Sequence, residues 1–193
     1  RRGPLARSVL GTTATHLLRT ARIPMLVVGG GGLPDGPLRV LLTTDLSHHA
    51  AHAHARGLAV ARALGTDAPE LRSLYVQTPY LADGPMPLPL PAESTAERDL
   101  LDFLDAEVPH VEIEACVRSG DAASEIVHEA RAWDADLLVL GTHGRRGASR
   151  VFLGSVAETV LRNAPCAVLV IPPLGLYSMR TDPAGATPAL TGA

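Results

Sequence analysis

The sequence comprises 193 residues, enough for one full-sized hydrophobic core and a fragment of another. Its net charge of −3 argues against binding to nucleic acids or to anionic membrane surfaces. Its longest apolar runs are far shorter than the roughly 20 residues of a membrane-spanning helix, and its first residues, RRGPLARSV, do not resemble a signal peptide. We therefore expect a cytoplasmic protein that binds neither nucleic acid nor membranes.

Only 3% of the residues are aromatic, so the core must consist mainly of Ala, Val, Leu and Ile, which suits helices packed on a parallel sheet. From residue 39 onward, apolar runs that predict strands alternate with amphipathic or Ala-rich runs that predict helices. Such alternation indicates crossover units and an α/β fold with a mostly parallel sheet. The predicted elements are a strand at 39–45, a helix at 47–65, a strand at 71–76, a helix at 92–107, a strand at 111–117, a helix at 120–134, a strand at 136–140, a helix at 154–164 and a strand at 167–171.

Two segments predict irregular structure. Residues 77–91 carry five prolines, which are incompatible with a continuous helix or a central strand. The tail, 173–193, is rich in Pro, Gly, Thr and Ala, and we expect it to be disordered.

The beginning of the chain repeats its end. Residues 10–28, LGTTATHLLRTARIPMLVV, align without a gap with 153–171, LGSVAETVLRNAPCAVLVI, and eight of nineteen positions are identical. We therefore predict that residues 1–28 are the last helix–strand unit of an earlier copy of the domain, and that 29–37, GGGGLPDGP, are a linker. Both a truncated tandem protein and a gene fragment are compatible with this pattern.

A glycine-containing segment, GTHGRRGASRVFLGS (141–155), links the apolar strand DLLVL to a helix. A helix N-terminus offers unpaired N–H groups and the positive end of its dipole, and glycines let phosphate oxygens approach the backbone. Asp45, at the end of the first strand, could lie opposite Gly141 on the rim where ligands bind in open parallel sheets. The segment is neither a Walker A loop nor a dinucleotide motif. Phosphate binding and purely structural glycines both remain open.

The same segment fits the signature G-x2-G-x9-G-[ST] of the universal stress protein family. The flanking DADLLVLGTHGRRG and GSVAETVLRNAPCAVLVI resemble the closing half of that family, and VLLTTDLS resembles its opening strand with its aspartate. The resemblance covers 38–172 as a complete domain, with 1–28 similar to the end of a preceding copy. It implies an α/β fold with an open five-stranded parallel sheet of order 3-2-1-4-5 and helices on both faces, Rossmann-like and of the adenine nucleotide alpha hydrolase type.

In the ATP-binding branch of this family the signature holds ATP, so the resemblance implies ATP, with Mg²⁺, as the cofactor. Arg145 and Arg146 either face the phosphates or form a solvated pair. One departure is Leu46-Ser47, where the family commonly has Gly-Ser, and the leucine could narrow the mouth of the site. Carried over position by position, the implied binding residues are Gly141, His143, Gly144 and Arg145 beside the ribose and phosphates, Gly154, Ser155 and Val156 around the phosphates, Thr43 and Asp45 at the ribose–adenine side, and Val76 against the adenine.

The histidines, cysteines and possible catalytic side chains give no indication of a second functional site. His48 and His52 are spaced to share a helix face, but no third metal ligand stands at an obvious spacing, so we expect no metal and surface histidines at 48, 49, 52 and 54. Cys116 and Cys166 lie in apolar runs and are expected to be buried and reduced. No nucleophile–base pair is evident, so we predict no catalytic residues and at most slow ATP hydrolysis.

Three functions follow from these residues. The favoured one is an ATP-binding stress-response or regulatory module that acts through nucleotide-dependent conformation, dimerisation or an unknown protein partner. The alternative is a scaffold that binds no nucleotide and dimerises through its last strand, and a nucleotide-using enzyme is disfavoured by the missing catalytic set. Because the strand at 167–171 would be an exposed apolar edge, we predict that 24–28 pair with it in an intrachain pseudo-dimer, or that a homodimer forms there.

Overall fold

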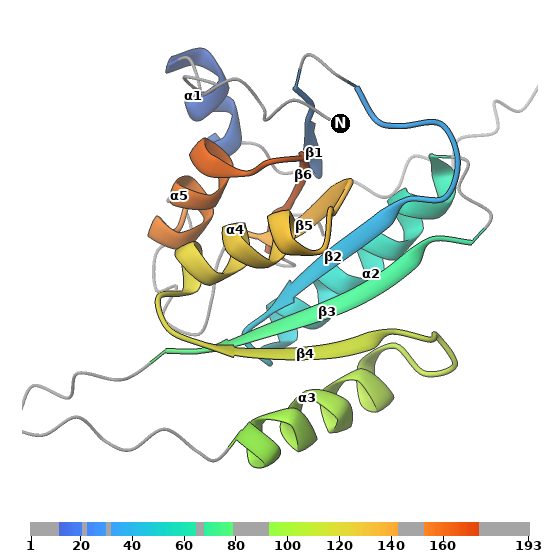
Figure 1. Ribbon diagram of the computed structural model, residues 1–193. Coiled ribbons are helices and arrows are strands. Elements are labelled where there is room, and N and C mark those ends of the chain that lie inside the picture. Colours follow the sequence, from blue (N-terminus) through green and yellow to red (C-terminus); the bar gives the residue numbers. More distant parts are fainter. Residues whose placement is uncertain are drawn as a thin grey trace, which may run out of the picture.

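The protein forms one six-stranded sheet of order β1-β6-β5-β2-β3-β4 (Figure 1). The computed structural model describes residues 12–20, 23–29, 32–64, 68–78, 93–142 and 153–173. Five strands run parallel to their neighbours, whereas β1 runs antiparallel to β6. The elements are α1 (Thr12–Thr20), β1 (Met25–Val27), β2 (Arg39–Thr44), α2 (His48–Ala63), β3 (Glu70–Gln77), α3 (Glu93–Glu107), β4 (Glu114–Ser119), α4 (Ala122–Ala132), β5 (Leu137–Gly141), α5 (Ser155–Asn163) and β6 (Ala167–Ile171).

The parallel strands confirm the predicted order 3-2-1-4-5 when counting starts at β2. The five predicted parallel strands are present, and the sheet differs from the implied five-stranded one by a sixth strand, β1, with Met25 opposite Val170 and Val27 opposite Val168; this is one of the two arrangements predicted for residues 24–28. All five residues of β6 are buried, so its outer backbone groups need a hydrogen-bonding partner, and β1 supplies it.

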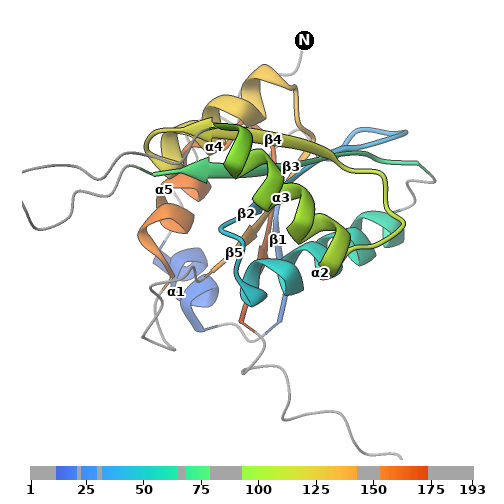
Figure 2. The ribbon, with the colours of Figure 1, turned by 90° about the horizontal axis from the view of Figure 1, so that it is seen from below.

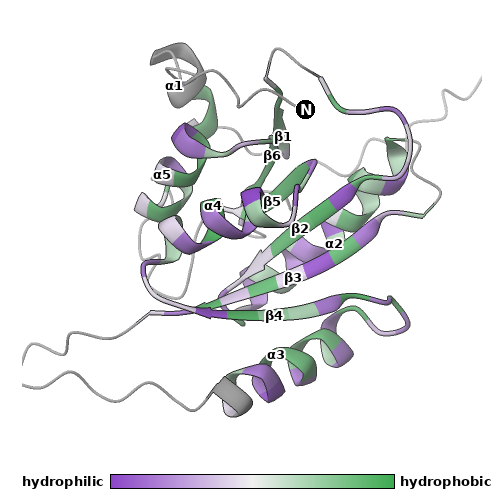
Figure 3. Cartoon of the chain, viewed as in Figure 1, coloured by the Kyte–Doolittle hydropathy of each residue, from purple (hydrophilic) through white to green (hydrophobic). Residues whose placement is uncertain are grey.

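Helices cover both faces of the sheet, as predicted (Figures 1 and 2). We call the side under α4, α5 and α1 the first face, and the side under α2 and α3 the second face. Alternation along β2 sends Leu41 into the core of the first face and Val40 and Leu42 into that of the second. Apolar residues run along the central strands, and polar residues follow the outer sides of the helices (Figure 3). This is the two-sided burial expected of a parallel sheet.

Local signals explain the positions of α2 and α4. Ser47 caps α2 by accepting a hydrogen bond from the amide of Ala50, and Asp121 caps α4 by accepting one from Ser124. Gly57 lets α2 approach the sheet closely, since a Cβ there would lie 2.7 Å from Val139 Cγ1. The Ser47 cap starts α2 directly after the carboxyl end of β2.

Strand β4 begins later in the chain than the predicted strand at 111–117. It begins at Glu114, because its pairing with β3 starts at the pair Arg72–Glu114. Val111 and Ile113 still pack against the core of the second face, but outside the strand. The proline-rich residues 79–92 and the tail 174–193 lie outside the described residues.

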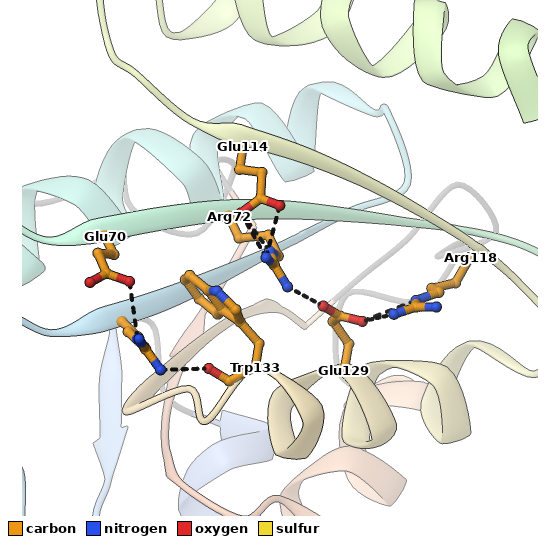
Figure 4. Close-up of polar contacts among 7 residues, drawn as sticks. Glu70, Arg72, Glu114, Arg118, Glu129 and Trp133 are labelled. Atoms are coloured by element: carbon orange, nitrogen blue, oxygen red, sulfur yellow. Dashed lines mark hydrogen bonds and ion pairs between the residues drawn. The ribbon is translucent and has the colours of Figure 1, made fainter.

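A charged network joins β3, β4 and α4 on the first face (Figure 4). Glu129, only 1% exposed, accepts hydrogen bonds from Arg72 Nη1 and from Arg118 Nη2, each at 2.5 Å. Arg72 also binds Glu114 and lies 4.6 Å from the ring centroid of Trp133. Burial tends to raise the pKa of Glu129, but the two arginines hold it below its usual value. The buried carboxylate is thus charged and paired on both sides.

Candidate functional site

The carboxyl ends of β2 and β5 lie side by side at the point where the sheet reverses its winding. From β2 the chain crosses the second face through α2 to β3, and from β5 it crosses the first face through α5 to β6 (Figure 2). In open parallel sheets such a switch point is where ligands bind. The residues at this edge therefore form the candidate functional site.

The N-terminus of α5 is the main polar feature of this edge. Gly154 is its N-cap residue, and no side chain among the described residues caps the helix, unlike α2 and α4. The amides of Ser155 and Val156 belong to the first turn and have no acceptor within the helix, and both residues are exposed. The helix thus presents donors and the positive end of its dipole at the switch point.

Thr142 fixes this helix end to the sheet. Its amide donates to the carbonyl of Ile171 at 3.0 Å, and its carbonyl accepts from the amide of Gly154 at 3.1 Å. A Cβ on Gly154 would lie 3.2 Å from the same Thr142 oxygen, so the close approach favours glycine. Sequence reasoning missed Thr142, because the G-x2-G spacing treats it as a spacer and its two partners lie far along the chain.

The end of β2 is held by short side-chain hydrogen bonds. Thr43 is buried and its hydroxyl donates to the carbonyl of Val139 at 3.0 Å, which ties β2 to β5. The Oδ1 atom of Asp45 accepts from the amide of Ser47 at 3.1 Å and from its hydroxyl at 2.5 Å. Continuing the β2–β3 register by one residue places Asp45 opposite Val76, which packs against the core of the first face.

Leu46 occupies the position where a glycine is common in the family that the sequence resembles. Its φ of 64° lies in the left-handed region, which costs a leucine roughly 1–2 kcal/mol relative to glycine. Its amide donates to Thr44 Oγ1 at 2.9 Å, and its side chain packs against the core of the second face. The backbone conformation suited to glycine is therefore kept, and the leucine side chain packs on the face opposite α5.

Seven of the ten implied binding residues lie in the described part of the chain. Six of them belong to the edge formed by β2, β5 and α5, and the seventh, Val76, lies on the neighbouring strand β3. His143, Gly144 and Arg145 lie outside the described residues, as do Arg146 and Arg150.

The histidines of α2 lie in no cluster of potential metal ligands within the part of the chain that the structure describes. The described residues hold no group of three or more His, Cys, Asp or Glu side chains that could bind a metal ion. His48, whose Nδ1 lies 4.0 Å from Glu107 Oε1, and His49 are exposed, while partial burial and the neighbouring charges of Arg56 and His49 lower the pKa of His52. His48 and His49 thus match the expected surface position, whereas His52 is half-buried.

The prediction of His54 as a surface histidine was wrong. Four residues after Ala50 it lies on the stripe of α2 that faces the sheet, and it is 0% exposed. Nδ1 donates to the carbonyl of Ala50 at 3.0 Å, so the neutral ring accepts the Ser73 hydroxyl hydrogen bond at Nε2, 2.9 Å away. Burial lowers the pKa of His54 to about 4. This histidine belongs to the core.

Both cysteines are free thiols, but only Cys166 is buried as expected. Cys166 is buried, and burial raises its pKa to about 12. Cys116 is partly buried, and burial and then the Glu129 charge raise its pKa as well. Neither thiol has the lowered pKa of a reactive cysteine.

The model of the universal stress protein family matches residues 38–172. The chain belongs to the universal stress protein family. A universal stress protein of Mycolicibacterium smegmatis is 32% identical over 180 residues, which cover 89% of this chain and 58% of that protein. Another, MJ0531 of Methanocaldococcus jannaschii, is 48% identical over 66 residues, 34% of this chain and 39% of that protein.

Solved structures show the same fold. A putative universal stress protein from Pseudomonas aeruginosa superposes with a TM-score of 0.66 at 23% identity, covering 92% of this chain and 62% of that one. A universal stress protein solved in complex with cAMP superposes with a TM-score of 0.51 at 23% identity, covering 69% of this chain and 96% of that one. This universal stress protein thus spans less than two thirds of the M. smegmatis and P. aeruginosa proteins.

None of the helices in the described segments combines the length and the apolar character needed to cross a bilayer.

Proposed function

We propose that this universal stress protein binds ATP, with Mg²⁺, at the switch point between β2 and β5. The observation that carries the proposal is the glycine-capped N-terminus of α5 at the carboxyl end of β5. Unpaired first-turn amides and the helix dipole favour a phosphate group at such a place. Catalysis is not part of the proposal.

The residues at the edge fit the parts of a nucleotide. The amides of Ser155 and Val156 and the Ser155 hydroxyl would bind phosphate oxygens, and Gly154, without a Cβ, lets this helix end lie close to the Thr142 carbonyl. The carboxylate of Asp45 is suited to accept hydrogen bonds from ribose hydroxyls. Val76 offers an apolar surface to the adenine. A bound Mg²⁺ would neutralise part of the phosphate charge.

The sequence signature would complete this site with His143, Gly144 and Arg145. Arg145 would place a positive charge against the phosphates. These three contributions rest on the resemblance of the signature, whereas those of Gly154 and Asp45 also rest on the geometry of the described edge.

A nucleotide at this edge would touch the helix that leads to the outer strands. α5 continues into β6, which pairs with β1, and Glu158 of α5 forms an ion pair with Arg19 of α1 at 3.2 Å. The hydrogen bonds of Arg162 and Arg19 lower the pKa of Glu158, so this contact is charged at neutral pH. We propose that nucleotide occupancy acts through α5 on the α1–β1 region, and thereby on conformation, dimerisation or a protein partner.

Isothermal titration calorimetry tests the proposal. With Mg²⁺ present, we expect ATP to bind the full chain, and Ser155→Ala to weaken binding about 2- to 10-fold through the loss of one hydrogen bond. Thr12→Ala is the matched control, because Thr12 is the counterpart of Ser155 in the repeat and begins α1. The Thr12→Ala protein should bind ATP with the affinity of the unmodified chain. Gly154→Val should reduce binding further, because its side chain would push the helix end away from the Thr142 carbonyl and displace the first-turn amides.

A chain that releases no heat with millimolar ATP would contradict the proposal. Titration with cAMP in parallel then separates a change of nucleotide from the absence of any nucleotide, because one structural neighbour was solved with cAMP. If neither ligand binds, the scaffold function is the second candidate, favoured by the antiparallel pairing of β1 with β6. A scaffold of this kind should lose solubility or change its oligomeric state when residues 1–37 are removed.

A further inference from the structure

The turn between β2 and α2 holds a carboxylate in place through one neighbouring residue. The amide and the hydroxyl of Ser47 both donate to Oδ1 of Asp45, at 3.1 Å and 2.5 Å. So short a hydroxyl contact is typical of a carboxylate acceptor. Because two donors from one residue meet one oxygen, rotation of the Asp45 carboxylate is restricted.

Ser47 is also the N-cap residue of α2, but its hydroxyl lies closer to Asp45 than to the capped amide. The hydroxyl oxygen accepts from the amide of Ala50 at 3.3 Å. By comparison, the carboxylate of Asp121 caps α4 directly and accepts from the amide of Ser124 at the shorter distance of 2.9 Å. Capping of α2 therefore accounts for only part of what the Ser47 hydroxyl does, and its stronger contact is the one with Asp45.

The backbone that carries Asp45 is fixed on both sides. Before it, the Thr43 hydroxyl donates to the carbonyl of Val139 at 3.0 Å. After it, the amide of Leu46 donates to Thr44 Oγ1 at 2.9 Å, and the Leu46 side chain packs against the core of the second face. Contacts within the protein thus set both the position of this backbone and the orientation of the carboxylate before any ligand binds.

We infer that Ser47 is a positioning residue that holds Asp45 in the orientation for binding the 2′- and 3′-hydroxyls of a ribonucleotide. The inference rests on the proposed nucleotide site. An ionised carboxylate only accepts hydrogen bonds, and the two ribose hydroxyls are neighbouring donors. A carboxylate that is already oriented loses little rotational freedom on binding, so its contacts with the hydroxyls contribute more to affinity.

The consequence is selectivity for the sugar. A site built to accept hydrogen bonds from a ligand hydroxyl discriminates strongly against a ligand that lacks it. The chain therefore prefers ribonucleotides to deoxyribonucleotides, and this preference depends on the Ser47 hydroxyl. Loss of that hydroxyl lowers the preference itself as well as the overall affinity.

Isothermal titration calorimetry of the full chain with ATP and with 2′,3′-dideoxy-ATP, each with Mg²⁺, tests the inference. The quantity compared is the ratio of the two dissociation constants. We expect 2′,3′-dideoxy-ATP to bind the unmodified chain about 10- to 100-fold more weakly than ATP. In Ser47→Ala the ratio should fall to about 3-fold or less, because the amide alone then holds the carboxylate.

Two further variants distinguish positioning from a structural role. Ser47→Thr retains the hydroxyl and should keep the high ratio. Ser124→Ala removes the matching hydroxyl contact of Asp121 in α4, 2.7 Å long, and should keep the ratio of the unmodified chain. A general loss of stability leaves the ratio unchanged, because both nucleotides bind the same folded state. If Ser47→Ala does not fold, Ser47→Gly takes its place, since glycine is the better N-cap.

The outcomes separate the inference from the proposed function. If ATP binds but the ratio is the same in Ser47→Ala as in the unmodified chain, the inference is overturned and the nucleotide site stands. The same holds if Ser47→Thr behaves like Ser47→Ala, or if the unmodified chain binds both nucleotides equally well. A chain that binds neither nucleotide overturns the proposed function, and this inference with it.

Discussion

Replacing Glu129 with alanine is expected to lower the free energy of unfolding by about 3–5 kcal/mol. Arg72 and Arg118 both donate to this buried carboxylate, so its removal leaves two guanidinium groups without their shared counter-charge. Arg72 is itself largely buried beneath Trp133. Urea unfolding followed by the fluorescence of Trp133, the only tryptophan, measures the loss directly.

Glu114→Ala provides the matched control. Glu114 also binds Arg72, but its side chain is 58% exposed, so we expect a loss of less than about 1 kcal/mol. Equal effects of the two substitutions would show that burial of Glu129 does not set the energy of the network.

The contribution of Glu129 to stability depends on pH. Because its pKa is lowered in the folded state, this contribution is present above the unfolded pKa and is lost as pH falls through the folded pKa.

Acidification from pH 7 to pH 4 is expected to remove about 3 kcal/mol of stability through His54 alone. The folded pKa of about 4 lies below the ordinary value of 6.5, because burial between Ser73 and Phe103 disfavours the charged ring. Below pH 6.5 the unfolded chain therefore binds a proton that the folded chain does not. Stability is highest above pH 6.5 and falls until the pH reaches the folded pKa.

Unfolding free energies measured at several pH values between 4 and 7 check this expectation. His54→Asn keeps a donor near the carbonyl of Ala50 but does not titrate. The part of the change in unfolding free energy with pH that is due to His54 should therefore disappear from the slope of free energy against pH. His128→Gln, at an exposed position of α4, should keep the slope of the unmodified chain. An unchanged slope in His54→Asn would contradict the assignment.

Much of the candidate site could be predicted from the sequence because its signals are short-range. The spacing from Gly141 to Gly154 and Ser155, and the aspartate that ends the first strand, are visible as patterns within a few residues. The alternation of strands and helices predicted a mostly parallel sheet, and the family resemblance implied the strand order that the structure confirms. The roles of His143, Gly144 and Arg145 stay predictions.

Other features depend on residues that meet only in the folded chain. Thr142 joins Ile171 to Gly154, and Leu46 turns its side chain to the second face through a left-handed backbone. His54 looks like its exposed neighbours in the sequence, and its burial depends on which stripe of α2 meets β3 and α3.

The sequence by itself determined the elements and the mostly parallel character of the sheet, since periodicity is a property of neighbouring residues, and its motif spacing pointed to the family whose fold implies the strand order. Only the tertiary structure decided the strand register, the antiparallel direction of β1 beside β6, and the burial of His54 and Glu129. Each of these depends on which side chains from distant segments share one space. Local patterns do not encode that choice, because packing and hydrogen bonding select it only when the sheet is assembled.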